Sequence, residues 1–218
     1  LIDWMSFTSK IDSTSSLIET LGLTSPEIVW QEMYGFHGYK NRLYFCGISI
    51  HYNGFNDDIW LEMSGEGCRA FETFSETGWE PIFEMLIENE KEYHVTRIDI
   101  AYDDFEKKID IQNLASETFK NNFITKFKDA EVICRVRAEA LTINYGSKSS
   151  EVFFRCYDKA KERKREDIAH WVRFEVQLRD SRAIEFLKKY SEGESIGKTF
   201  FGVVNNYVRY IVPNANDI

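Results

Sequence analysis

Two segments of the chain alternate between polar and apolar residues, and a period of two is the signature of a β-strand with one buried face. In TRIDIAYDDF (residues 96–105), one face carries Arg97, Asp99, Ala101 and Asp103. In WVRFEVQLR (residues 171–179), the corresponding face carries Arg173, Glu175, Gln177 and Arg179. Isoleucine, valine, leucine and aromatic residues occupy the opposite faces. The chain is therefore expected to contain an antiparallel sheet with one apolar face and one polar face.

The rest of the chain adds further strands and several helices to this sheet. Apolar residues at three- and four-residue spacing predict helices after Gly65, over residues 110–122 and over residues 196–211. The charged run DKAKERKRED (residues 158–167) is predicted as a helix as well. We therefore expect an α+β fold, with a largely antiparallel curved sheet and helices packed on one face.

The domain organisation follows from the order of these elements. Strand, strand, helix, strand occurs twice, ending at Asp103 and at Arg179, which suggests two similar halves. No Pro- or Ser-rich linker separates them, so residues 1–218 are predicted to form a single catalytic domain. The opening LIDWMSFTSK is typical of a strand that begins within a protein, and we expect the chain to be excised from a longer one.

Composition limits the classes of partner and site. The longest apolar runs fall short of 18 residues, so a membrane partner is not expected. The four cysteines lack CxxC spacing and are predicted to be reduced, buried thiols of a cytosolic protein. The four histidines show no HxH or HExxH spacing, which disfavours zinc. A net charge of −9 confines any nucleic-acid surface to a local basic patch.

A tyrosine between two cations is the most unusual feature of the segment VFFRCYDKAK (residues 152–161). Alternation places Tyr157 on one strand face with Arg155 and Lys159. Tyr157 is either a core aromatic at the rim of the sheet or a nucleophile beside phosphate-binding cations. As a nucleophile it needs help, because tyrosine has a pKa of about 10. We expect Arg155 and Lys159 to lower that pKa.

The carboxylates of Asp99, Asp103 and Glu175 could serve the same chemistry. Oxygen ligands of this kind suit Mg²⁺ or Mn²⁺, and such an ion would neutralise charge on a phosphodiester. Together with Tyr157 they would permit DNA cleavage through a covalent phosphotyrosyl intermediate. A solvated outer sheet face would produce the same pattern without any function. The basic run is likewise either a solvated helix face or a contact to the DNA backbone.

Four motifs, taken in order, resemble one known family. LEMSGEGCRAFE, VTRIDIAYDD, TINYGSKSSEVFFRCYDKAKE and RFEVQLR are similar to motifs of the replication initiation factor family of rolling-circle plasmids, filamentous phages and integrative conjugative elements. The resemblance implies a site-specific, metal-dependent enzyme of the bacterial cytoplasm that nicks and rejoins one DNA strand at a replication or transfer origin. No His-hydrophobic-His motif is present, so any comparison with histidine-ligated nickases reaches only the general chemistry.

The same resemblance assigns roles to residues and implies partners. Tyr157 would form a 5′-phosphotyrosine intermediate, aided by Arg155 and Lys159, and Asp99, Glu175 and Asp103 would hold Mg²⁺ or Mn²⁺. Contacts to DNA are expected from Arg97, Lys148, Lys161, Arg163 and Arg173. The expected partners are single-stranded or supercoiled origin DNA and a helicase or other replication protein, with a homodimer as an open alternative. Two other interpretations stay open: a non-catalytic module that binds origin DNA or a helicase, and a structural domain.

Overall fold

The computed structural model describes residues 1–211, so residues 212–218 of the predicted single domain lie outside the described part. The chain divides into two compact units, each built from two segments of sequence. The first unit comprises residues 1–100 and 178–194, and the second comprises residues 101–177 and, of the described part, residues 195–211. The α+β class and the antiparallel strand pairing are confirmed in both units.

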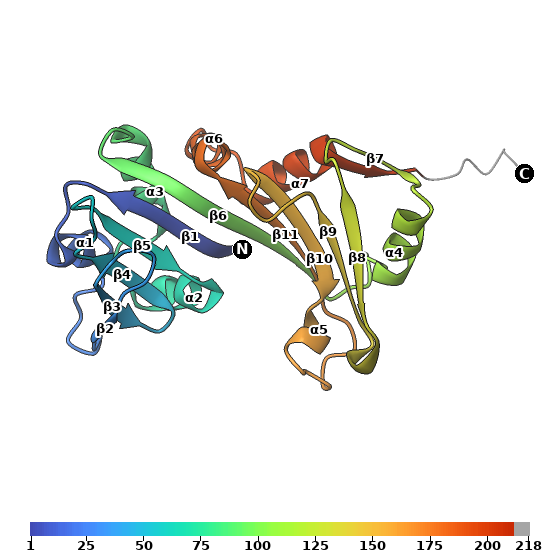
Figure 1. Ribbon diagram of the computed structural model, residues 1–218, viewed down its shortest axis with the longest axis horizontal. Coiled ribbons are helices and arrows are strands. Elements are labelled where there is room, and N and C mark those ends of the chain that lie inside the picture. Colours follow the sequence, from blue (N-terminus) through green and yellow to red (C-terminus); the bar gives the residue numbers. More distant parts are fainter. Residues whose placement is uncertain (212–218) are drawn as a thin grey trace, which may run out of the picture. The chain divides into compact units, whose positions relative to one another are not determined.

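The first unit contains a sheet in the strand order β2-β3-β4-β5-β1-β6 (Figure 1). Its strands are β1 (Ile2–Ser9), β2 (Gln31–Tyr34), β3 (Asn41–Phe45), β4 (Ile48–Tyr52), β5 (Ile59–Met63) and β6 (Tyr93–Asp104, of which residues 93–100 belong here). β1 runs antiparallel to both of its neighbours, β5 and β6. A register shift against β1 leaves Thr96 of β6 as an extra residue, which is a β-bulge.

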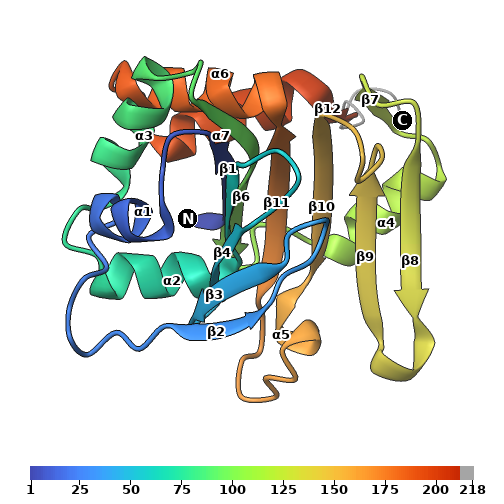
Figure 2. The same cartoon turned by 60° about the vertical axis from the view of Figure 1, so that its left-hand side comes forward.

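Helices of the first unit are α1 (Thr14–Thr20), α2 (Gly65–Phe74), α3 (Trp79–Glu88) and α6 (Asp180–Ser191). α2 packs against β1, β4 and β5, and α3 packs against α6 (Figure 2). The start of α2 lies so close to the β3–β4 turn that a Cβ on Gly67 would sit 2.3 Å from the carbonyl oxygen of Gly47. Fully buried Phe7, Phe71 and Phe83 fill the core between these elements.

The second unit contains strands in the order β11-β10-β9-β8 and a separate pair, β12 with β7. Its elements are α4 (Ile111–Phe119), β7 (Phe123–Thr125), β8 (Ala130–Arg135), the 3₁₀ turn η1 (Val136–Ala138), β9 (Ala140–Tyr145), β10 (Val152–Asp158), α5 (Lys159–Glu162), β11 (Val172–Arg179), α7 (Ile196–Tyr207) and β12 (Val208–Tyr210). α4 lies against β8, β9 and β10 (Figure 1). Aromatic rings form the core, with Phe154 packed edge-on against Phe127, Phe174 and Tyr207.

Three predictions about local structure were wrong. The helix expected over residues 158–167 is the single turn α5, because Lys164 adopts φ 53°, which is incompatible with an α-helix. The last helix ends at Tyr207 rather than residue 211, since Val208–Tyr210 pairs as a strand with Phe123–Thr125. Only half of the cysteines are buried: all four are free, but Cys46 and Cys134 are exposed.

No helix within residues 1–211 is both long and apolar enough to cross a membrane.

The polar residues of β11 do not form the solvated sheet face that alternation alone would allow. Arg173, Glu175 and Gln177 are all buried, with exposed fractions of 5–7%. Buried charges require partners. Their partners define the candidate site.

Candidate functional site

Tyr157 lies next to the last residue of β10, in direct contact with a carboxylate and an ammonium group. Its hydroxyl donates a hydrogen bond to Oε1 of Glu175 at 2.5 Å, and Nζ of Lys159 donates to the same hydroxyl at 3.0 Å. Glu175 lies on β11, which neighbours β10 in the sheet, and Lys159 follows Tyr157 by two residues, as period-two alternation requires. The phenol oxygen is therefore bound by one group that can accept its proton and one that can stabilise its anion.

Arg155 completes this cluster from the same strand. Its Nε and Nη2 donate to Oε2 of Glu175 at 3.0 and 2.6 Å, and its guanidinium lies 4.5 Å from the centre of the Tyr157 ring. Lys159 also forms an ion pair with Glu162 at 3.0 Å. The structure thus brings together three residues predicted to be catalytic, with Glu175 at their centre.

The pKa of Tyr157 is raised and not lowered as expected, although Arg155 acts in the expected direction. Burial raises the pKa of Tyr157 well above its usual range, and the Glu175 carboxylate beside the hydroxyl raises it further. Arg155 and Arg173 act in the opposite direction without overcoming these effects. Tyr157 is 4% exposed, so the desolvation of a phenolate outweighs its attraction to the cations. The hydroxyl is therefore protonated at neutral pH, and as a nucleophile it would need a base.

A second buried cluster forms where the end of β6 meets the start of β11. Asp103 accepts hydrogen bonds from Nε and Nη2 of Arg173 and from Nε1 of Trp171, all at 2.7 Å. Burial opposes ionisation of Asp103, but these hydrogen bonds outweigh it and lower its pKa. The neighbouring Asp104 binds His170 at 3.2 Å. Arg173, predicted to contact DNA, is 6% exposed and serves here as the partner of Asp103.

The carboxylates predicted to bind metal are each held by an arginine. Glu175 binds Arg155 and Asp103 binds Arg173, both in the second unit. Asp99 lies in the first unit, where Arg97 donates to it from Nε at 2.7 Å and from Nη2 at 2.5 Å. Among residues 1–211, no group of three or more His, Cys, Asp or Glu side chains is arranged to hold a metal ion. The oxygen donors suit Mg²⁺ or Mn²⁺, but arginines occupy them in this arrangement.

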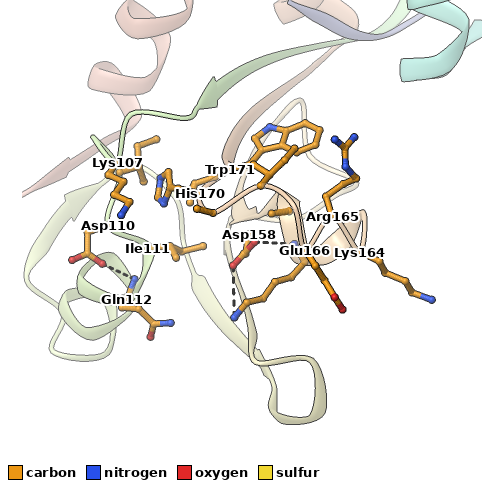
Figure 3. A pocket seen from close by; sticks show the side chains of 16 residues that line it. Lys107, Asp110, Ile111, Gln112, Asp158, Lys164, Arg165, Glu166, His170 and Trp171 are labelled. Carbon is orange, nitrogen blue, oxygen red and sulfur yellow. Dashed lines mark hydrogen bonds and ion pairs between the residues drawn. The ribbon is translucent and has the colours of Figure 1, made fainter.

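The other residues predicted to contact DNA lie at the surface of the second unit. Lys148 is in the β9–β10 turn, where its carbonyl accepts from Gln177, and Arg163 forms an exposed ion pair with Glu162. Lys161 lines an open pocket of about 960 Å³ together with Lys107, Lys164 and Arg165 (Figure 3). Nζ of Lys161 donates to the carbonyl of Glu139, and Lys161 also pairs with Asp158 at 3.8 Å.

Two features of the site were missed in the sequence. Trp171 and His170 directly precede β11, and neither was recognised as a partner of the acidic pair at the end of β6. The role of Glu175 as the hydrogen-bond acceptor of Tyr157 was missed too. The alternation of β11 placed the Glu175 carboxylate on a polar face, but it gave no signal for its partner on β10.

Comparisons with known proteins place these residues in a family. Residues 93–218 match the family described as Replication initiation factor, and residues 1–87 match the Rolling Circle replication initiation protein N-terminal domain. A solved structure of a rolling circle replication initiator protein from Geobacillus stearothermophilus is 29% identical, covers 100% of this chain and 88% of its own, and superimposes with a TM-score of 0.89. "Putative DNA relaxase NicK" of Bacillus subtilis (strain 168) is 25% identical over an alignment of 232 residues. That alignment covers 99% of this chain and 65% of the relative. The chain spans about two thirds of that relative's length. It belongs to the replication initiation factor family.

Proposed function

We propose that the chain nicks and rejoins one strand of DNA at a replication or transfer origin, with Tyr157 as the nucleophile. The observation that carries this proposal is the bonding of the Tyr157 hydroxyl to both Glu175 and Lys159. In the proposed step, the Tyr157 oxygen attacks the scissile phosphorus and the bond from phosphorus to the 3′ oxygen breaks. Tyr157 gives up its proton and the departing 3′ oxygen gains one, so the products are a 5′-phosphotyrosine and a strand that ends in a 3′-hydroxyl, and rejoining is the reverse reaction.

The roles of the surrounding residues follow from their contacts. Glu175 is the general base that takes the proton of Tyr157, because its Oε1 already accepts that hydrogen bond. Lys159 stabilises the phenolate as it forms. Arg155 bridges Glu175 and the face of the Tyr157 ring, and its side chain is 37% exposed, so it can also contact the phosphate.

A divalent cation stays part of the proposal. The carboxylates of Glu175 and Asp103 would hold Mg²⁺ or Mn²⁺ once Arg155 and Arg173 moved from them to the phosphate. Asp99 is bound to Arg97 in the first unit, and its predicted role as a third ligand stays a prediction. The ion would supply charge neutralisation of the phosphoryl group.

The burial of Tyr157 favours a second candidate function. A hydroxyl on a residue that is 4% exposed cannot reach a phosphate without local rearrangement, and a module that binds origin DNA without chemistry needs no such access. The nicking proposal therefore includes a step in which the substrate displaces Arg155, the more exposed member of the cluster. A bacterial cytoplasmic location, a helicase or other replication partner and a homodimer are further proposals, which follow from the family.

The test is formation of a covalent adduct. A pool of single-stranded oligonucleotides with a randomised centre and a 3′ fluorophore is incubated with the protein and Mn²⁺ and then separated on a denaturing gel. Fluorescence should migrate with the protein, because the 5′-phosphotyrosine retains the 3′ part of the strand. Tyr157→Phe should abolish the adduct, whereas Tyr190→Phe, which loses only a hydrogen bond to Glu80, should retain it.

Three results separate the two functions. An adduct that persists in Tyr157→Phe would refute the assignment of the nucleophile. Sequence-selective binding in EDTA without an adduct under Mg²⁺ or Mn²⁺ would favour the non-catalytic module. Neither binding nor an adduct would refute both.

A further inference from the structure

A groove in the first unit has aromatic and cationic walls and plays no part in the proposed nicking step. It has a volume of about 520 Å³. The residues that line it include Trp4, Tyr39, Trp60, Glu62, Arg97 and Arg179. All belong to the first unit, whereas Tyr157 and Glu175 belong to the second. Of these six, only Arg97 was predicted from the sequence to contact DNA.

The floor of the groove is a small residue between two opposite charges. Ser6 of β1 pairs with Glu62 of β5 on one side and with Arg97 of β6 on the other. Because neighbouring strands lie about 4.8 Å apart, the backbones of Glu62 and Arg97 are separated by about 10 Å. The hydroxyl of Ser6 bonds to Thr96 at 2.7 Å, so the short side chain leaves the space above it open. Since Thr96 is the bulge residue, both it and Arg97 reach the groove.

Aromatic rings border this floor on two sides. Trp60 stacks on His51 with ring centres 4.5 Å apart. The rings of His37 and Tyr39 in the β2–β3 loop have their centres 5.5 and 6.1 Å from that of Trp60. On the other side, the Arg97 guanidinium lies 4.4 Å from the ring centre of Trp4. The groove is therefore a slot with flat apolar walls, one carboxylate and a cationic rim.

Exposed aromatic surface continues beyond the slot. Phe55 is 98% exposed and lies beside Gly38 of the β2–β3 loop, and Phe36 of that loop is 47% exposed with Arg42 stacked 4.4 Å from its ring centre. Aromatic rings interspersed with cations are the usual surface for unpaired nucleotides, because any base can stack on a ring while the cations neutralise the backbone. An acidic body with such a local surface fits a polyanion with exposed bases better than a duplex.

We propose that this groove binds one unpaired base of single-stranded DNA and reads its edge through Glu62. A carboxylate accepts hydrogen bonds from the N–H groups of a base. Guanine presents two such donors side by side, N1–H and N2–H, cytosine and adenine present an amino group, and thymine presents only one ring N–H. Guanine should therefore bind most tightly and thymine most weakly. Arg97 and Arg179 neutralise the flanking phosphates. The choice of DNA as the polymer rests on the proposed function.

The test measures binding without cleavage. Fluorescence anisotropy is recorded in EDTA with labelled thymine 12-mers that carry one central guanine, cytosine, adenine or thymine. The guanine oligonucleotide should bind about tenfold more tightly than the all-thymine one. Glu62→Gln should reduce this preference to about threefold or less, whereas Glu66→Gln, which removes an exposed carboxylate on α2, should preserve it. Trp60→Ala should weaken all four, whereas Phe119→Ala, which removes a 75% exposed ring in the second unit, should not.

Several outcomes would overturn the inference. These are equal affinity for all four oligonucleotides, a guanine preference that survives Glu62→Gln, or no binding at all. Glu62→Gln is nearly isosteric, so it keeps the test valid even if Trp60→Ala fails to fold. The adduct assay on the wild-type protein, run beside this titration, separates the two proposals. Base-selective binding without any adduct refutes only the nicking function, and an adduct with base-independent binding refutes only the groove.

Discussion

Replacing Glu175 with glutamine should uncouple DNA binding from DNA cleavage. The glutamine side chain would keep an amide oxygen within reach of the Tyr157 hydroxyl but could not take its proton. General base catalysis by a side chain in direct contact contributes about 10²- to 10⁴-fold, or roughly 3–5.5 kcal/mol of activation free energy. The hydroxyl and Oε1 of Glu175 are only 2.5 Å apart, so the whole of this contribution should be lost.

The same change should affect stability much less. Arg155 is 37% exposed at its side chain, so water compensates for most of its lost ion pair. The hydrogen bond from Tyr157 is retained in neutral form. We expect the free energy of unfolding in urea to fall by about 1–2 kcal/mol. Glu106→Gln, which breaks an exposed ion pair with Lys108, is the matched control and should change neither quantity.

The assay is the rate of adduct formation with the 3′-labelled oligonucleotide, measured from pH 6 to pH 10. Because the Glu175 charge helps to raise the pKa of Tyr157, Glu175→Gln should lower that pKa. The rate of adduct formation by this variant should then rise about tenfold per pH unit, as the phenolate forms without a base. A Glu175→Gln rate equal to the wild-type rate at pH 7 would refute the role of Glu175 as proton acceptor. A loss that no increase in pH restores would indicate a structural role instead.

Three further predictions concern the fold. Gly67→Ala should lower the free energy of unfolding by about 2 kcal/mol, because the new Cβ would meet a carbonyl oxygen. Gly202→Ala in α7 should raise it by about 0.5–1 kcal/mol, because a Cβ there meets nothing within 4 Å. Urea titration measures both changes. Burial, with help from nearby cations, lowers the pKa of His51 to about 4, so the unfolded chain takes up its proton first as the pH falls. About 3 kcal/mol of stability should be lost between pH 6.5 and pH 4, and His51→Phe should flatten this dependence. An aromatic disulfide reagent should label Cys46 and Cys134 in the native protein, and the two buried thiols only after unfolding; rapid labelling of all four would contradict the buried sites.

The sequence predicted well whatever depends on alternation along a single strand. Arg155, Tyr157 and Lys159 share a face because they are two residues apart, and the structure bonds them into one cluster around the Tyr157 hydroxyl and Glu175. Arg173 and Glu175 share a face for the same reason. The polar face was expected to meet solvent or a metal ion, but it meets other side chains of the protein. Periodicity gives the face of a strand and does not give the strand opposite, because pairing depends on distant parts of the chain.

The groove was missed for a related reason. Trp4 and Trp60 each lie on a strand whose apolar face dominates the pattern, and β1 and β5 are about fifty residues apart in sequence. Only the register, with Ser6 opposite both Glu62 and Arg97, shows that the two tryptophans border one slot. The bulge at Thr96 could not be foreseen either, because it departs from the alternation on which the strand was predicted.

The state of Tyr157 links burial to the control of its chemistry. A tyrosine activated by cations alone would be a phenolate at rest and would be open to side reactions. Burial keeps Tyr157 neutral, and Glu175 is bound to Arg155 while the substrate is absent. A phosphate that draws Arg155 away would release the Glu175 carboxylate from its ion pair at the moment when the Tyr157 hydroxyl becomes accessible, so that Glu175 could accept the proton of Tyr157. Substrate binding and activation of the nucleophile would then be one event, because the same guanidinium covers the ring and neutralises the base.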